Sequence, residues 1–403
     1  MVDPADPDPD KLRRASARGD KVGEGYTPID AALLDLLPRA GRIGRELAVR
    51  VDLARSLGLR NTLARASADA HLRSIPEGGS RLGYEEIWRD AAVEVGADVR
   101  RIAGGFLEFT KGESCARVWN HVVSLDNSVA HKLSLDKMLV HRLLEDVGLP
   151  VPGHLEFDSG SLAAARDFMA DGPGSAHVVK PVTSEAGSGV TTSVRTPRQL
   201  RRAVLRASRL DRRLAIERQA EGHVHRVLML DGEMLDVVRR LPPSVVGDGR
   251  SSVAQLIAAE NDRRLRRAGR RGRPQLLLVD LDCLFTLEAA GLTVRSVLPA
   301  GVETQVKTSV SQNGPEQNES VVRRGVPAAG LVAEARRAVE VLGLRLAVVE
   351  IVTPDVSIPL HDAGGVIVEI NAPPGLSYHY DVREPDHAVR VAVPILRRML
   401  AIG

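Results

Sequence analysis

The stretch GGVIVEINAPPG, from Gly364 to Gly375, joins an apolar strand pattern to polar groups at its end. Apolar residues alternate up to Glu369 and Asn371, which lie two positions apart, and the segment closes on two prolines and a glycine. In a strand, side chains at positions i and i+2 point to the same face. The pattern therefore predicts a pair of oxygen ligands at one end of a strand, which suits a hard cation.

A second candidate strand, LAVVEIVTPD, carries Glu350. If this strand pairs with the strand of Glu369 and Asn371, the three side chains can share one oxygen-lined site. Oxygen ligands without imidazoles or thiols suit Mg²⁺, which keeps bound waters and is completed by substrate phosphates. A single strand glutamate is as often an ordinary salt-bridged residue, so the coincidence of three ligands favours the metal site.

The stretch VVKPVTSEAGSGV places Lys180 at the end of a strand, before a loop of small residues. Gly187 and Gly189 allow the backbone to approach a ligand closely, so that its N–H groups can bind phosphate oxygens. The loop is not a Walker loop, because no Gly-Lys-Ser/Thr follows the glycines, and it is not the Rossmann fingerprint. Taken alone, the loop could be a simple hairpin turn, and Lys137 in SLDKMLVHRLL could be a solvated helix lysine.

The remaining sequence predicts strands and helices that alternate, as in a mixed α/β or α+β chain. The first 29 residues form a polar tail that is expected to be disordered. Residues 30–125 are expected to be a mixed, mostly helical region without a chemical motif. Asp231-Gly232, between two alternating apolar runs, predicts a two-residue β-hairpin. The stretch VAHKLSLDKMLVHRLLEDVGLPVPG predicts one helix that glycine and proline end.

The composition weighs against several classes of protein. Of the 403 residues, 43% are hydrophobic and 27% charged, and the net charge is +3, as expected for a globular protein of two or three domains. No apolar run could span a bilayer, and the N-terminus has no secretory core, so we expect a cytoplasmic protein without a membrane partner.

Cys115 and Cys283 make no metal or redox motif. RRLRRAGRRGR contains seven arginines but no aromatic residue, so nucleic acid is not an expected partner.

Taken in series, these features resemble the ATP-grasp superfamily: a helix lysine, a Lys-Pro strand with a glycine loop, an acidic strand end and a final Glu-x-Asn-x-x-Pro-Gly. Within it, the chain is most similar to the ATP-grasp part of cyanophycin synthetases and related amino-acid and peptide ligases. The likeness covers about Asp126 to Tyr380 and is carried by DKMLVHRLLEDVGLPVP, VVKPVTSEAGSGV, VVGDG, VTPDVSIPL and VIVEINAPPG.

The resemblance implies an α/β (α+β) ATP-grasp fold in which two α+β subdomains hold ATP between them. Residues 126–175 would then be a helical linker and first segment. Residues 176–216 would form a small lid subdomain with the glycine loop, and residues 217–403 a C-terminal subdomain with the metal site.

The same resemblance assigns roles to individual residues. Those expected to bind ATP are Lys137, Lys180, Ser184, Gly187, Ser188, Gly189, Glu217 and Glu221. The expected Mg²⁺ ligands are Glu350, Glu369 and Asn371. The expected catalytic residues are Arg226, which matches an arginine on the strand after the hinge, and Arg295 or Lys307, either of which would face the transferred phosphate. Val224 stands where relatives usually have an acid for the ribose, so either Glu221 substitutes for that acid or the ribose is held differently. The stretch KTSVSQNG differs from the corresponding loop of cyanophycin synthetases, which predicts a different acceptor.

The implied reaction is amide formation between a carboxylate and an amine through an acylphosphate, with release of ADP and phosphate. ATP and two Mg²⁺ ions are the expected cofactors, with Mn²⁺ as an alternative. The expected partners are small amino-acid or peptide substrates and a second copy of the chain in a homodimer. A carboxylate kinase that stops at the acylphosphate and a non-catalytic nucleotide-binding scaffold would use the same residues, so both alternatives stay open.

Overall fold

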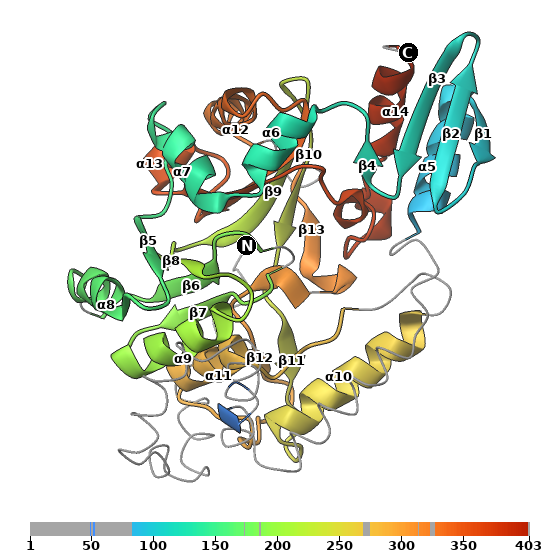
Figure 1. Ribbon diagram of the computed structural model, residues 1–403. Coiled ribbons are helices and arrows are strands. Elements are labelled where there is room, and N and C mark those ends of the chain that lie inside the picture. Colours follow the sequence, from blue (N-terminus) through green and yellow to red (C-terminus); the bar gives the residue numbers. More distant parts are fainter. Residues whose placement is uncertain are drawn as a thin grey trace.

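The computed structural model contains helices and antiparallel sheets in four parts (Figure 1). A central sheet carries a smaller sheet on one side and an N-terminal module on the other, with an insertion below. No helix within the described ranges is long and apolar enough to cross a membrane. The described residues are 49, 51–52, 83–172, 174–184, 187–268, 275–312, 314–322 and 327–401.

The central sheet is fully antiparallel and has the order β13-β10-β9-β14-β15. Asp231 and Gly232 join β9 to β10 with positive φ angles of 49° and 79°, which confirms the predicted two-residue hairpin. Its strands are β13 (Asn318–Ser320), β10 (Glu233–Arg240), β9 (His223–Leu230), β14 (Leu346–Thr353) and β15 (Val366–Asn371).

The two faces of the central sheet pack against different parts of the molecule. Val227 and Met229 of β9 belong to a core that also contains the buried side of α12, whereas Leu228 faces the core shared with the N-terminal module. Because side chains alternate along a strand, Arg226 lies on the same face as Leu228. The helices beside this sheet are α6 (Ser128–Ser134), α7 (Lys137–Glu145), α12 (Ala329–Val341) and α13 (Leu360–Ala363).

The predicted single helix around Lys137 is wrong, because two helices stand there. The side chain of Asp136 accepts hydrogen bonds from the backbone N–H groups of Met138 and Leu139 and so starts α7 after a break. As a result, Lys137 is the first residue of α7, and its side chain is buried.

The smaller sheet has the antiparallel order β5-β8-β6-β7 and packs against α8 and α9. It extends beyond the predicted range of 176–216, because β5 comes from the segment that the sequence assigned to the linker and β8 ends at Arg218. Its elements are β5 (His154–Asp158), α8 (Leu162–Ala170), β6 (His177–Pro181), β7 (Thr191–Val194), α9 (Pro197–Ala207) and β8 (Arg213–Arg218).

The described part of the N-terminal region is richer in strand than the mostly helical prediction for residues 30–125. Apolar side chains alternate in FLEFTK and SCARVW, so that Leu107, Phe109 and Val118 are buried on one face of a sheet. They share a core with Leu228 and Leu346 of the central sheet. The module consists of α5 (Tyr84–Val95), β1 (Asp98–Arg101), β2 (Phe106–Lys111), β3 (Ser114–Trp119) and β4 (Val122–Val123), with α14 (Ala392–Leu400) packed on α5.

An insertion between β10 and β13 has its own small core around Val253, Cys283 and Leu298. Its elements are β11 (Ser244–Val246), α10 (Val253–Ala268), α11 (Leu281–Ala289), β12 (Glu303–Gln305), η2 (Val310–Gln312) and η3 (Pro315–Gln317). Two short helices, η4 (Leu376–His379) and η5 (Pro385–His387), follow β15. Cys115 is exposed and Cys283 buried, and both are free thiols.

Candidate active site

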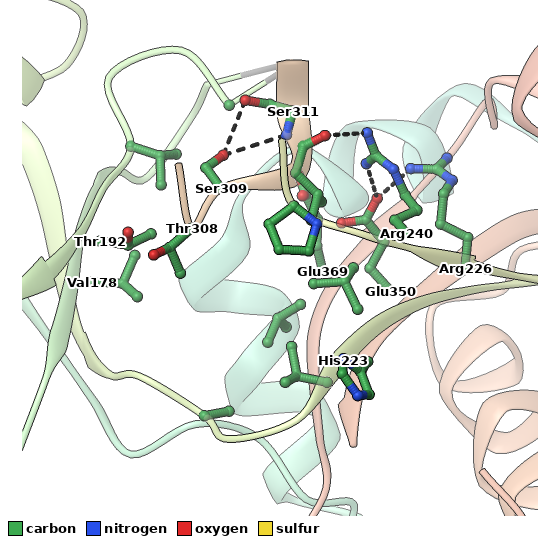
Figure 2. A pocket seen from close by; sticks show the side chains of 18 of the residues that line it. Val178, Thr192, His223, Arg226, Arg240, Thr308, Ser309, Ser311, Glu350 and Glu369 are labelled. Atoms are coloured by element: carbon green, nitrogen blue, oxygen red, sulfur yellow. Dashed lines mark hydrogen bonds and ion pairs between the residues drawn. The ribbon is translucent and has the colours of Figure 1, made fainter. Parts of the chain in front are cut away.

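A cavity of about 2280 Å³ is lined by residues of the central sheet, the smaller sheet and the insertion. Pockets for one small molecule usually measure about 300–1,000 Å³, so this cavity has room for more than one substrate. The sequence-predicted residues in its wall are Lys137, Lys180, Ser184, Gly187, Glu217, Glu221, Arg226, Glu350, Glu369 and Asn371. Figure 2 shows part of this wall.

The predicted pairing of the two acidic strands is confirmed. β14 and β15 are antiparallel, with Glu350 directly opposite Glu369, and Asn371 lies two residues further along β15. Burial, together with the nearby Glu350 carboxylate, raises the pKa of Glu369, while Lys137 acts in the opposite direction. Two neighbouring carboxylates, of which Glu350 is buried and Glu369 partly buried, gain from a bound cation, because its charge offsets both desolvation and their mutual repulsion.

The donor set fits Mg²⁺ when phosphate oxygens complete the site. Within the described ranges, no group of three or more His, Cys, Asp and Glu side chains could hold a metal alone. Mg²⁺ is usually held by one or two carboxylates plus substrate phosphates and water. Glu350, Glu369 and the amide oxygen of Asn371 therefore provide enough oxygen ligands from the protein for such an ion.

Two arginines and a tyrosine surround Glu350. Arg226 lies opposite Glu350 on the neighbouring strand β9 and forms an ion pair with it, and Arg240 Nη1 of β10 lies 3.6 Å from Glu350 Oε1. Figure 2 shows both guanidinium groups pointing towards this carboxylate. Each guanidinium carbon also lies 4.6 Å from the ring centroid of Tyr378, a cation–π distance. Arg240 and Tyr378 are not among the residues predicted from the sequence.

The two predicted lysines of the cavity wall are both buried. Lys137 Nζ donates a hydrogen bond to the backbone oxygen of Ser184 at 2.5 Å and lies 3.4 Å from Glu369 Oε1. Lys180 Nζ lies 2.6 Å from Glu217 Oε1, and both side chains are at most 7% exposed. Lys137 is thus beside the acidic strands, whereas Lys180 is paired with the predicted hinge acid.

The glycine loop lies against the insertion. Gly187 and Gly189 have positive φ angles of 69° and 77°, which favour glycine. A Cβ atom on Gly187 would lie 2.6 Å from the Cβ of Ser311, so the loop backbone touches the segment around Ser309 and Ser311. Ser188 is exposed, and neither Ser188 nor Gly189 belongs to the described cavity wall.

Glu221 and Val224 both line the cavity, three residues apart. Glu221 is exposed, and Val224 is partly buried at the start of β9. The role of Glu221 towards a ribose stays a prediction.

Two of the three predicted catalytic residues, Arg295 and Lys307, lie outside the described cavity wall. Arg295 is exposed in the insertion. Lys307 is 2% exposed, and its Nζ atom lies 2.8 Å from Asp280 Oδ1 and 3.6 Å from Asp282 Oδ2. A lysine held by two buried carboxylates is a structural ion pair, and only Arg226 of the three lies at the acidic strands.

The low pKa values of two buried histidines predict that the free energy of unfolding falls in acid. Burial lowers the pKa of both His141 and His225 to about 4. Between pH 6.5 and 4 the unfolded chain binds protons that the folded chain does not, so the stabilisation present above pH 6.5 is lost as the pH falls. Each histidine should account for about 3 kcal/mol of the free energy of unfolding by pH 4.

Urea unfolding at several pH values between 7 and 4 tests this expectation. The His225→Gln variant should show a flatter pH dependence than the parent protein, because one of the two groups no longer titrates. Parallel curves for the two proteins would contradict the assignment.

The chain is 30% identical over 354 residues to the cyanophycin synthetase of Nostoc sp. (strain PCC 7120), an alignment that covers 84% of this chain and 38% of the relative. It is 31% identical over 216 residues to a glutathione biosynthesis bifunctional protein of Mannheimia succiniciproducens, covering 52% of this chain and 28% of that protein. No protein-family model matches.

One solved structure supports the fold. The crystal structure of a bifunctional glutathione synthetase from Pasteurella multocida aligns with a TM-score of 0.52 and 21% identity, covering 80% of this chain and 44% of that one. The chain spans 38% of the length of the Nostoc relative. The relationship thus extends over most of this chain but over less than half of each of these proteins.

Proposed function

From the premise that the chain has an ATP-grasp fold and is related in sequence to cyanophycin synthetases, we propose that it is an ATP-dependent carboxylate–amine ligase. The observation that supports this most is the row of Arg226, Glu350 and Glu369 across three adjacent strands, with Lys137 beside it. Such a row places cation ligands next to groups that can hold anionic substrates.

The reaction has two steps. A substrate carboxylate oxygen attacks the γ-phosphorus of ATP, so that an O–P bond forms while the bond from that phosphorus to the β–γ bridging oxygen breaks, releasing ADP. The amine nitrogen then attacks the acyl carbon, a C–N bond forms, the bond to the phosphate oxygen breaks, and the nitrogen loses a proton. Neither step needs a covalent nucleophile from the protein, so positioning and charge neutralisation dominate.

Different side chains around the cavity would hold the cation, bind the phosphate and orient the substrate carboxylate. Glu350, Glu369 and Asn371 would hold Mg²⁺, which when bound neutralises the charge on the phosphate oxygens. Lys137 would hold a phosphate oxygen beside this site, since its Nζ atom is 3.4 Å from Glu369 Oε1. Arg226 would orient the carboxylate that becomes phosphorylated. The glycine loop would cover the acylphosphate and exclude water, which would otherwise hydrolyse it.

Phosphate release from Mg-ATP with panels of amino acids and short peptides, combined with mass spectrometry, tests the proposal. A condensed product that appears with phosphate supports the ligase and identifies its substrates. An acylphosphate trapped as a hydroxamate, without amide, would replace it with a carboxylate kinase. Binding of ATP without any turnover would leave a nucleotide-binding scaffold.

The wider expectations form part of the same proposal. We propose two Mg²⁺ ions per site, with Mn²⁺ as a substitute, amino-acid or peptide substrates, a homodimer and a cytoplasmic location. Two free cysteines agree with a reducing compartment. Metal titration in the presence of a non-hydrolysable ATP analogue would give the number of ions, and sedimentation equilibrium would give the number of chains.

The Gly187→Ala variant should bind ATP about tenfold more weakly, since positive φ and a close neighbour together should cost about 1.4 kcal/mol. The added Cβ would lie 2.6 Å from the Cβ of Ser311, so the loop and the segment of Ser311 would have to move apart. Isothermal titration with an ATP analogue measures the change.

Gly343→Ala is the matched control for this variant. Gly343 also has a positive φ, of 64°, but a Cβ atom there meets nothing within 4 Å. It should lower stability without changing ATP affinity. Equal affinities for the parent protein and both variants would mean that the glycine loop does not bind the nucleotide.

A further inference from the structure

The short helix η4 begins five residues after Asn371, and contacts fix each of its four side chains. Leu376 is fully buried in the core shared with the N-terminal module, and Ser377 hydrogen-bonds Tyr84 of that module. Tyr378 presents its ring to two arginines, and His379 reaches Asp236. This small element thus connects β15 to the N-terminal module and to strands β9 and β10 of the central sheet.

Strand β10 carries two of the residues that η4 contacts. Asp236 and Arg240 lie four positions apart on β10, so both point to the same face of the sheet. The consecutive residues His379 and Tyr378 contact these two positions, and η4 packs along β10. A shift of His379 would therefore also move the tyrosine ring that the arginines contact.

The Asp236–His379 pair is unusual in its burial. Both side chains are 0% exposed, and His379 Nδ1 lies 2.7 Å from Asp236 Oδ2. Asp236 Oδ1 and His379 Nε2 are buried without a hydrogen-bond partner among the described residues. Polar atoms in such a place lower stability relative to apolar side chains of the same shape. The pair does, however, fix the direction of the imidazole ring, which apolar packing would leave less well defined.

We propose that Asp236 and His379 are positioning residues of the ligase site. Their hydrogen bond sets the orientation of η4 and holds the ring of Tyr378 against the guanidinium groups of Arg226 and Arg240. Those groups are thereby kept at Glu350, where the carboxylate substrate and the transferred phosphoryl group meet. This inference rests on the proposed function, because the arginines matter only if that chemistry occurs there.

The test compares His379→Leu with His379→Asn. Leucine removes the donor, and asparagine can place an amide N–H near the position of Nδ1. We expect kcat for phosphate release to fall about 30-fold in the leucine variant with KM for ATP unchanged, and to recover to within about fivefold in the asparagine variant. The Ile257→Ala variant, which opens a cavity in the core of the insertion, controls for lost stability alone.

Tyr378→Leu provides a second route if His379→Leu does not fold, because Tyr378 is only partly buried. It should lose kcat to the same extent as His379→Leu, with little change in melting temperature. A kcat that stays at the parent value in Tyr378→Leu, or in a folded His379→Leu that melts early like Ile257→Ala, would overturn the proposal.

Crystal structures of the parent protein and the His379→Asn and His379→Leu variants separate this proposal from the proposed function. Movement of the Tyr378 ring away from the arginines in the leucine variant alone would support the positioning role. A ring that keeps its place in both variants would overturn it. If the parent protein formed no amide or acylphosphate, the ligase would be rejected, and the ring position would still decide whether the pair orients Tyr378.

Discussion

Replacing Glu369 with glutamine is expected to lower ATP-dependent amide formation by about a thousandfold, or about 4 kcal/mol of transition-state stabilisation. Glutamine keeps the shape of the side chain but removes the negative charge that would hold a cation at the transferred phosphoryl group. Glu350 stays opposite on β14, so one carboxylate is left where the proposed site uses two. The measurement is kcat/KM for phosphate and amide release at saturating Mg²⁺.

The same variant should fold as well as the parent protein. Burial raises the pKa of Glu369, so a neutral side chain removes a charge from an unfavourable place. Glu303→Gln is the matched control, because Glu303 is an exposed glutamate in the wall of the same cavity. A loss of tenfold or less in a folded Glu369→Gln protein would exclude Glu369 as a ligand of the catalytic metal.

Replacing Lys307 with methionine is expected to reduce the free energy of unfolding by about 3–5 kcal/mol, as usually observed when one partner of a buried ion pair is removed. Methionine has a similar length but leaves Asp280 and Asp282 without the ammonium group that lies 2.8 and 3.6 Å from them. Arg206 continues to pair with Asp280 at 2.7 Å, so part of the charge stays compensated. Urea denaturation measures the effect.

The Lys307→Met variant also tests whether Lys307 contributes only to stability or has the catalytic role that the resemblance assigned to it. The rate per folded molecule should match that of the parent protein, because the side chain is buried outside the described cavity wall. Arg295→Met, at an exposed position, should change neither stability nor rate by a measurable amount. A large loss of kcat in a folded Lys307→Met protein would show that Lys307 takes part in the reaction.

Local patterns predicted the parts of the site that depend on neighbours in the chain. The two-residue spacing of Glu369 and Asn371 was enough to place them on one face, whereas pairing with the strand of Glu350 was a condition that the structure meets. The hairpin at Asp231-Gly232 needed only its turn residues. The break before Lys137 was also readable, because an aspartate precedes that lysine and is a favoured residue at a helix start.

Contacts between distant segments could not be predicted in this way. Arg240 and Tyr378 meet only because β10 and η4 pack together, and neither sequence neighbourhood contains a sign of the other. The role of Lys307 was assigned by resemblance, but the fold of the insertion places this lysine against Asp280 at the start of α11. The direction of a side chain in an insertion depends on that insertion's own core.

The core that joins the N-terminal module to the central sheet has a consequence for how the protein unfolds. Trp88 and Phe109 of the module pack in one apolar cluster with Leu228 and Leu346 of the central sheet. Opening either part would expose the apolar surface of the other, so the two should behave as one cooperative unit. Amide hydrogen exchange should therefore give β2 and β9 the same opening free energy, and a fragment that begins at Asp126 should lose protection in β9.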